Sequence, residues 1–302
     1  MLDIFSNIDG VHMEGNNSSC VVLGDSLSIL PKIKTNSVDL IFADPPYGLG
    51  KDFGITKDCF ANAEEYLSWC KTWIDECMRI LKQTGTMYFM SSTQHMPTLD
   101  RYVDENYFVI NRIVWIYDSS GVQSKAKFGS LYEPILMITH NDKVDYTFNY
   151  QDIMVEARTG AERKLIDYRK TPPQPYNTQK VPGNAWEFSR VRYKMNEYEN
   201  HPSQKPEALL ERIILASSNK GDIVLDPFCG SFTTSAVATR LGRRAVGIDI
   251  NPDYFKIGLR RTGLAFEYEG DVLYKDKSRK TKNKSKNNHY SNAGQLALDI
   301  PI

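Results

Sequence analysis

The sequence predicts an α/β protein with a doubly wound, mostly parallel sheet. Two short apolar runs, residues 38–43 and 223–225, each lead into an acid followed by proline, and a third run, residues 244–251, carries an acid near its end. Helical patterns of apolar residues separate these runs. Strands that alternate with helices are typical of parallel sheets, in which ligands bind beyond the carboxyl ends of the strands.

The same periodicity predicts the other elements. Residues 63–81 carry apolar side chains at helical spacing, Cys70 and Cys77 among them, and are expected to pack on the core. Residues 51–63 are expected to form a loop that moves near the substrate. The remaining expected strands are residues 20–24, 85–90, 113–117 and 136–139, and the remaining expected helices are residues 26–30, 207–217 and a stretch through 236–241.

The segment Asp44-Pro45-Pro46-Tyr47 carries the strongest chemical signal in the chain. Proline fixes the backbone and offers a carbonyl acceptor without an N–H donor, so Asp44 and the Pro45 carbonyl can accept both hydrogens of a planar amino group. Tyr47 can stack on the ring that carries that group. Taken alone, the segment also suits an ordinary strand-ending turn with a capping acid.

The second signal is the loop at residues 226–231, followed by a helical stretch and a strand that ends in an acid. Asp249 lies 19 residues after Gly230, close to the spacing of about 20 residues at which an acid reaches ribose hydroxyls in dinucleotide sites. The glycine pattern is poor for NAD, because Phe232 stands where a second glycine is expected. S-adenosylmethionine has a ribose and an adenine but no phosphate, and it fits such a loop.

Together these motifs resemble those of the DNA methyltransferases that methylate amino groups with S-adenosylmethionine. DPPY precedes DPFCG here, which is similar to the circularly permuted β group of that family. Residues 23–27, LGDSL, resemble the element that meets the cofactor adenine, and residues 201–206, HPSQKP, resemble the element that opens the helix before the cofactor strand. The resemblance covers roughly residues 20–262 and implies a class I methyltransferase fold with an inserted target-recognition region.

The central segment, with PPQPYN and NHPSQKPEALL, is most similar to solitary bacterial adenine methyltransferases of the ATGCAT-recognising type. One position departs from the family pattern. Phe232 stands where most members carry glycine, so the resemblance does not fix the fine shape of the methionine pocket.

The resemblance implies a role for each motif residue. Asp44, Pro45, Pro46 and Tyr47 are expected to be catalytic, acting on the N6 amine of an adenine flipped out of duplex DNA. No metal is needed, because positioning and electrostatics carry a methyl displacement of this kind. The expected cofactor residues are Asp25 at the adenine, Asp249 at the ribose, Asp226, Gly230 and Lys205 at the methionine portion, and Ser203, Pro227, Phe228, Ile250 and Asn251 around them.

Several other functions remain open at this stage. Cytosine-N4 methylation uses the same corner, although the family usually places serine at the position of Asp44 for that reaction. Cytosine-C5 methylation needs a cysteine after proline, and Cys229 instead follows Phe228. RNA or protein methylases with this motif usually carry the cofactor motif first. A non-catalytic DNA-binding relative is the alternative from a different class, and the intact Asp44, Asp226 and Asp249 argue against it.

The net charge is zero, but the charges are unevenly placed. Residues 1–66 hold ten acids and four bases, whereas residues 158–194 hold nine bases and three acids, with aromatic residues interleaved. Basic side chains suit phosphates and aromatic ones suit unstacked bases, so double-stranded DNA is the expected partner. The basic residues expected to contact DNA are Lys125, Lys127, Arg169, Lys170, Lys180, Arg190 and Arg192.

The motifs divide the chain into four parts. Residues 20–140 are expected to form the catalytic half of the methyltransferase domain, residues 141–200 the target-recognition region, and residues 201–262 the cofactor-binding half. Residues 275–302 form a basic tail that is too poor in apolar residues to fold alone. Within it, Gln295-Leu296-Ala297-Leu298-Asp299-Ile300 resembles the peptides that dock on the bacterial replicative sliding clamp.

Composition suits a cytoplasmic, nucleoid-associated enzyme. The five cysteines form no C-x-x-C pair, which argues against a zinc site and for a reducing compartment. No apolar run is long enough to cross a bilayer, and the first residues do not resemble a signal peptide. Relatives of the β group are often dimers, so a homodimer is also expected.

Overall fold

The computed structural model describes residues 2–6, 11–53, 58–117, 125–126, 128–143, 145–157 and 165–265, and the backbone of residues 267–269 and 272–274. Two compact units result, residues 1–264 and residues 265–302. In its described part, the second unit contains one antiparallel strand pair, β14 (Glu267–Glu269) and β15 (Val272–Tyr274). The predicted clamp-docking segment at residues 295–300 lies outside the described residues.

The first unit is built on a central sheet, which in the described part of the chain has nine strands in the order β1-β2-β13-β12-β3-β4-β6-β5-β11. Its strands are β1 (His12–Gly15), β2 (Ser19–Leu23), β3 (Val38–Ala43), β4 (Leu81–Met90), β5 (Phe108–Ile116), β6 (Tyr132–Thr139), β11 (Ala185–Glu187), β12 (Ile223–Asp226) and β13 (Arg244–Asp249). The five neighbours from β2 to β4 are mutually parallel, whereas β1 and β6 run antiparallel to their partners. The predicted mostly parallel sheet is therefore confirmed.

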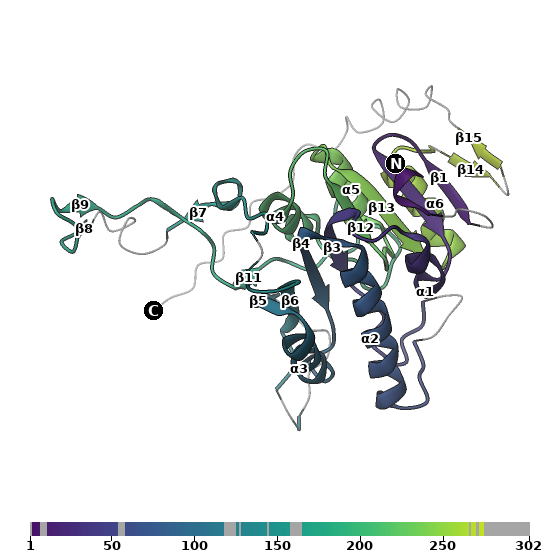
Figure 1. Ribbon diagram of the computed structural model, residues 1–302, viewed down its shortest axis with the longest axis horizontal. Coiled ribbons are helices and arrows are strands. Elements are labelled where there is room, and N and C mark those ends of the chain that lie inside the picture. Colours follow the sequence, from purple (N-terminus) through teal and green to yellow (C-terminus); the bar gives the residue numbers. More distant parts are fainter. Residues whose placement is uncertain are drawn as a thin grey trace, which may run out of the picture. The chain divides into compact units, whose positions relative to one another are not determined.

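Helices cover both faces of this sheet (Figure 1). Alternate residues of each strand face opposite ways, so Ile41 and Ala43 join the core beneath α2, while Leu40 and Phe42 join the core beneath α4 and α5. The helices are α1 (Ser26–Ile29), α2 (Ala63–Ile80), α3 (Met96–Asn106), α4 (Glu207–Ser217), α5 (Thr233–Arg240) and α6 (Pro252–Arg261).

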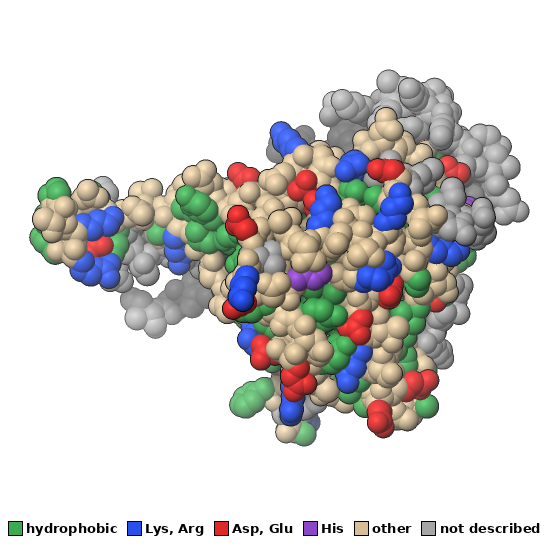
Figure 2. Space-filling model, in the orientation of Figure 1, with side chains coloured by type: hydrophobic (Ala, Val, Ile, Leu, Met, Phe, Trp, Pro, Cys, Tyr) green, Lys and Arg blue, Asp and Glu red, His purple; other side chains and the backbone are tan. Residues whose placement is uncertain are grey.

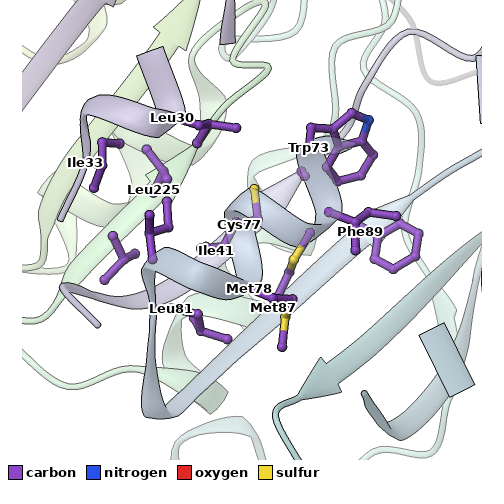
Figure 3. Close-up of a cluster of buried hydrophobic side chains, with 14 of the residues drawn as sticks. Leu30, Ile33, Ile41, Trp73, Cys77, Met78, Leu81, Met87, Phe89 and Leu225 are labelled. Carbon is purple, nitrogen blue, oxygen red and sulfur yellow. The ribbon is translucent and has the colours of Figure 1, made fainter. Parts of the chain in front are cut away.

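The largest helix, α2, shows how the apolar stripe read from the sequence is used. Asn62 caps its first turn by accepting a hydrogen bond from the Glu65 amide at 2.8 Å, and Trp73 and Cys77 of its inner face are fully buried. Figure 3 shows Trp73 beside Phe89 of β4, and their ring centroids lie 5.8 Å apart. This core fixes β3 and β4 beneath the loops that follow them.

The predicted elements agree with the structure where periodicity was strong. Residues 38–43 and 207–217 have the expected bounds, and α2 ends one residue before the expected residue 81. The strand expected at residues 136–139 begins earlier, at Tyr132. Residues 132–134 also pair with β5, and Pro134 lies opposite Val114. A proline normally argues against a strand, which hid this extension in the sequence. The strands expected at residues 85–90 and 113–117 also begin earlier, at Leu81 and Phe108. Among the described elements, sequence analysis missed β1, α3, β11 and α6 and the short strands outside the central sheet.

The segment expected to recognise the target contains little regular structure. Its short strands form two ribbons outside the central sheet, β7 (Val155–Glu156) with β10 (Gln179–Lys180) and β8 (Ile166–Asp167) with β9 (Gln174–Pro175). In Figure 2, lysine and arginine side chains lie on the part that carries β8 and β9. Part of this segment belongs to the main sheet, however, since β11 pairs with β5.

Candidate active site

A pocket of about 380 Å³ opens at the carboxyl edge of the parallel strands. This volume falls in the range of small-molecule and cofactor sites. Parallel strands bring their final residues to one edge, so the loops after β2, β3, β12 and β13 meet there. Every residue that the sequence predicted to be catalytic or cofactor-binding lines this pocket. Their individual roles remain predictions.

The catalytic corner is the group formed by Asp44, Tyr47, Glu133 and Lys205. Asp44 directly follows β3, and its Oδ2 accepts a hydrogen bond from Lys205 Nζ at 2.6 Å. Its Oδ1 accepts one from the Tyr47 hydroxyl at 2.8 Å. Both side chains of the ion pair are largely buried, with exposed fractions of 15% for Asp44 and 7% for Lys205. Asp44 is therefore held in one orientation from two sides.

Glu133 of β6 is the member of this corner that sequence analysis missed. Its Oε2 accepts a hydrogen bond from the Tyr47 hydroxyl at 2.9 Å and lies 3.5 Å from Lys205 Nζ. The available signal was a carboxylate at the start of an apolar strand, next to Pro134. Lys205 also differs from expectation, since its ammonium contacts the catalytic carboxylate. Its predicted contact with the methionine carboxylate has no test in the structure.

Burial and charge act against each other in this corner. Burial raises the pKa of Asp44, and the nearby Lys205 only partly offsets this. Burial alone lowers the pKa of Lys205, but attraction to Asp44 and Glu133 outweighs it and raises that pKa overall. Burial also raises the pKa of Tyr47. The lysine thus stays protonated and the tyrosine keeps its hydroxyl hydrogen at neutral pH.

The cofactor end is the pair of acids that close β12 and β13, Asp226 and Asp249. Asp226 accepts hydrogen bonds from the Phe228 amide at 2.9 Å and from the Thr234 hydroxyl at 2.5 Å. Asp249 accepts them from the backbone amides of Gly230 at 2.7 Å and Asn251 at 2.8 Å. Burial raises the pKa of Asp226 to about 7 and that of Asp249 to about 6.

The loop between these acids depends on one glycine. Gly230 has φ +50°, and a Cβ there would come within 2.6 Å of His201 Nε2. Phe232, the position that departs from the family pattern, also has a positive φ, of 55°. Its ring is fully buried and packs against Gly247 and Gly258, away from the pocket lining. The phenylalanine therefore leaves the pocket free of an extra ring.

The remaining cofactor residues line the pocket from several loops. Asp25 caps α1 through its carboxylate, and Ile250 exposes 46% of its surface beside Asp249. Asn251 is buried and its side-chain amide donates to the Phe53 carbonyl at 2.9 Å. Ser203, which lies in sequence between His201 and Lys205, also lines the pocket. Their predicted contacts with a cofactor remain predictions.

Six of the seven predicted DNA-contacting residues are described, and all six are exposed; Lys127 lies outside the described residues. Arg190 lines the pocket and lies over the Tyr117 ring at 5.1 Å. Arg169 is paired with Asp167 at 2.8 Å and lies over the Tyr176 ring. The basic residues therefore divide between the pocket mouth, the short ribbons and the loop that carries Lys125.

Among the described residues, no group of three histidine, cysteine or acidic residues could hold a metal ion. No described helix is both long and apolar enough to cross a membrane.

The family model described as DNA methylase matches residues 38–260, which include the catalytic corner and the cofactor end. This chain therefore belongs to the DNA methylase family. It is 56% identical to DNA adenine methyltransferase YhdJ of Escherichia coli (strain K12) over 277 residues, which are 92% of this chain and 94% of that protein. It is 37% identical to type II methyltransferase M.HpaI of Haemophilus parainfluenzae, over 82% of this chain and 74% of that protein.

Solved structures confirm the methyltransferase fold. PvuII DNA methyltransferase, described as cytosine-N4-specific, aligns with a TM-score of 0.62 at 18% identity, over 84% of this chain and 88% of that one. The M1.HpyAVI complex with SAM aligns with a TM-score of 0.54 at 23% identity, over 80% of this chain and 98% of that one. At these identities the likeness establishes the fold alone.

Proposed function

We propose that this DNA methylase transfers a methyl group from S-adenosylmethionine to the N6 amine of an adenine flipped out of double-stranded DNA. One observation carries the proposal: Asp44 lies in the same pocket as Asp226 and Asp249, at the ends of adjacent parallel strands. The high identity to an adenine methyltransferase supports adenine as the base.

The cofactor end suits the chemistry of S-adenosylmethionine. The hydrogen bonds given to Asp226 and Asp249 within the described residues come from a hydroxyl and from backbone amides. A ligand that carries an ammonium group and ribose hydroxyls supplies further donors to such acids. Asp249 would hold the ribose and Asp226 would face the methionine portion. When bound, S-adenosylmethionine supplies a methyl group that is activated by a sulfonium.

The catalytic corner provides the acceptors for the amine. The lone pair of an aromatic amine is delocalised into its ring, so the nitrogen is a weak nucleophile. Asp44 and the Pro45 carbonyl would accept its two hydrogens and favour a tetrahedral nitrogen with a localised lone pair. Tyr47 would pack on the base, which has to leave the duplex to reach the pocket. The methylated nitrogen then loses one proton, which Asp44 is placed to accept.

Cytosine-N4 methylation is the second candidate, because the PvuII enzyme shares this fold. Asp44 favours adenine, since serine is usual at this position in the N4 enzymes. A non-catalytic DNA-binding role would not explain why buried acids line the pocket.

The decisive experiment is transfer of a tritiated methyl group to unmethylated genomic DNA. Nuclease digestion and chromatography then identify the modified base. We expect N6-methyladenine. Labelled N4-methylcytosine would show that cytosine, not adenine, is the target base. A folded protein that binds the cofactor but transfers no methyl group would refute the enzymatic role.

The exposed basic residues are proposed to hold the DNA backbone. Lys180 of β10 and Lys170 are exposed, and Arg190 lies at the pocket mouth. Each lost phosphate contact should reduce the slope of log affinity against log salt by about 1. Fluorescence anisotropy of Lys180→Ala at several salt concentrations tests this, because an unchanged slope would remove Lys180 from the DNA surface.

Three finer proposals come from the sequence. The recognition site is proposed to be ATGCAT, which methylome sequencing of cells expressing the protein would identify. A homodimer is proposed, and analytical ultracentrifugation would detect it. Residues 295–300 are proposed to dock on the sliding clamp and so to bring methylation close to replicating DNA in the nucleoid. A peptide of residues 290–302 that fails to bind purified clamp at high micromolar concentration would rule this out.

A further inference from the structure

Glu133 is a partly buried carboxylate that has no role in the methyl transfer proposed above. It comes from β6, whereas Asp44 and Tyr47 follow β3 and Lys205 precedes α4. The exposed fraction of its side chain is 21%, and it contacts both groups that hold Asp44. Its two partners, the Tyr47 hydroxyl and the Lys205 ammonium, are also the two partners of Asp44.

The Tyr47 hydroxyl lies between the two carboxylates, 2.8 Å from Asp44 Oδ1 and 2.9 Å from Glu133 Oε2. A phenol has a single hydrogen to donate. The two carboxylates therefore share that hydrogen in a bifurcated bond, or one carboxyl group is protonated and donates to the phenol oxygen. Asp44 and Glu133 are therefore coupled through Tyr47, and the protonation of one depends on the other.

We propose that Glu133 is a positioning residue for methyl transfer, which sets the orientation and the charge of Asp44 through Tyr47 and Lys205. The proposal rests on the adenine-N6 function given above. Lys205 is shared between two acceptors, so Glu133 limits how strongly the ammonium neutralises Asp44. The aspartate is then a better acceptor for the amine hydrogens than it would be in an isolated ion pair.

The charges around Asp44 decide the direction of the expected pH effect. Negative charge on Glu133 raises the pKa of Asp44, and the ammonium lowers it. Removing that charge should therefore lower the pKa of Asp44 and strengthen its pairing with the lysine. The ionisable groups that act on Asp44 or respond to it are Tyr47 of its own loop, Glu133 of β6, Lys205 before α4, Asp226 of β12, Tyr66 of α2 and Lys51.

The test is the single-turnover rate of Glu133→Gln at saturating S-adenosylmethionine and DNA, across a range of pH. Glutamine keeps the size of the side chain and removes its charge. We expect the rate at neutral pH to fall about 10–100-fold, the range seen for side chains that orient the ligands of metal sites. The acid limb of the profile should move to lower pH, and cofactor affinity should stay within about twofold, since the variant leaves Asp226 and Asp249 intact.

Glu105→Gln is the matched control, because Glu105 forms an exposed pair with Arg101 on α3. A wild-type rate and an unmoved acid limb for Glu133→Gln would overturn the proposal. So would a slower rate without any movement of the limb, because that pattern indicates a packing role only. Wild-type protein that forms no N6-methyladenine would instead refute the proposed function, which keeps the two failures distinct.

Tyr47→Phe provides an independent check, and it covers the case in which Glu133→Gln fails to fold. It retains the ring and removes the hydroxyl that joins the two carboxylates. The Tyr47 hydroxyl lowers the pKa of Asp44, so Tyr47→Phe should move the acid limb to higher pH, opposite to the shift in Glu133→Gln. If Glu133 acts through Tyr47, the double variant should lose several-fold less than the product of the two single losses. Independent, multiplicative losses or an unmoved limb in Tyr47→Phe would overturn the proposal.

Discussion

The catalytic corner and the cofactor end place carboxylates at the same sheet edge but compensate them differently. Asp44 forms an ion pair with Lys205 at 2.6 Å. Asp226 and Asp249 instead accept hydrogen bonds from a hydroxyl and from backbone amides, and burial raises their pKa values to about 7 and about 6. One end of the pocket therefore carries its own counter-charge, whereas the other suits a ligand that brings donors with it.

This difference suggests a division of labour. A neutral aromatic amine brings no charge to the catalytic corner, so the protein has to fix the charge of that acceptor itself. A cationic cofactor favours ionisation of the acids that it meets, so these acids need no resident cation. Variants at the two ends should consequently affect different steps, catalysis at one end and cofactor binding at the other.

The largest effect is expected from Asp44→Ala. Loss of a group that stabilises the transition state typically costs 10²–10⁴-fold in rate, and we expect a fall of about 10³-fold or more. Cofactor affinity, measured by calorimetry, should remain within about threefold because the cofactor end is intact. Asp100→Ala, which removes a partly exposed pair with Arg112 outside the pocket lining, is the control. A near wild-type rate on duplex DNA would exclude Asp44 from the chemistry.

Asp249→Ala should give the converse result. Two charge-assisted hydrogen bonds to a ribose are worth about 1.5–3 kcal/mol each, and a loss of about 30–100-fold in cofactor affinity is expected after partial compensation by water. The single-turnover rate at saturating cofactor should fall much less. Calorimetric titration measures the affinity, and an unchanged value would remove Asp249 from the cofactor site.

The pH dependence of cofactor binding should follow the raised pKa values of the cofactor end. Asp226 and Asp249 are partly protonated near pH 6, and a cationic ligand favours their ionised forms. Binding should therefore release protons, and affinity should rise with pH by up to about tenfold per unit for each titrating acid, levelling off above about pH 7.5. Calorimetry in buffers of different ionisation enthalpy counts these protons. Cofactor binding to Asp226→Asn should release fewer protons than binding to the wild type. Equal proton release would contradict the proposed contact between Asp226 and the cofactor.

The smallest effect is expected from Thr234→Val. This nearly isosteric change removes the hydroxyl that donates to Asp226 at 2.5 Å. Without that donor the pKa of Asp226 should rise further, and cofactor affinity at pH 7 should fall about threefold to tenfold, since one hydrogen bond to a charged group contributes about 1.5 kcal/mol. The loss should shrink at pH 8.5. A loss that does not depend on pH would indicate altered packing instead.

The sequence alone determined the frame of this protein. Apolar runs that end in Asp44, Asp226 and Asp249 predicted the parallel strands and the edge at which their acids meet, because strand period and chain direction are local properties. The helices at residues 63–80 and 207–217 followed from their apolar stripes. Each of these elements is predicted by a pattern of apolar residues within its own short stretch of sequence.

Only the tertiary structure decided which side chains complete the site. Lys205 and Asp44 are separated by 161 positions, and Tyr47 and Glu133 by 86, so no local pattern links them. Glu133 was hidden beside Pro134, and the direction of the Phe232 ring depended on the space that Gly247 and Gly258 leave open. Contacts of this kind arise when separate strands and loops meet at one edge, because packing and burial rather than local propensity then decide the partners and charge states.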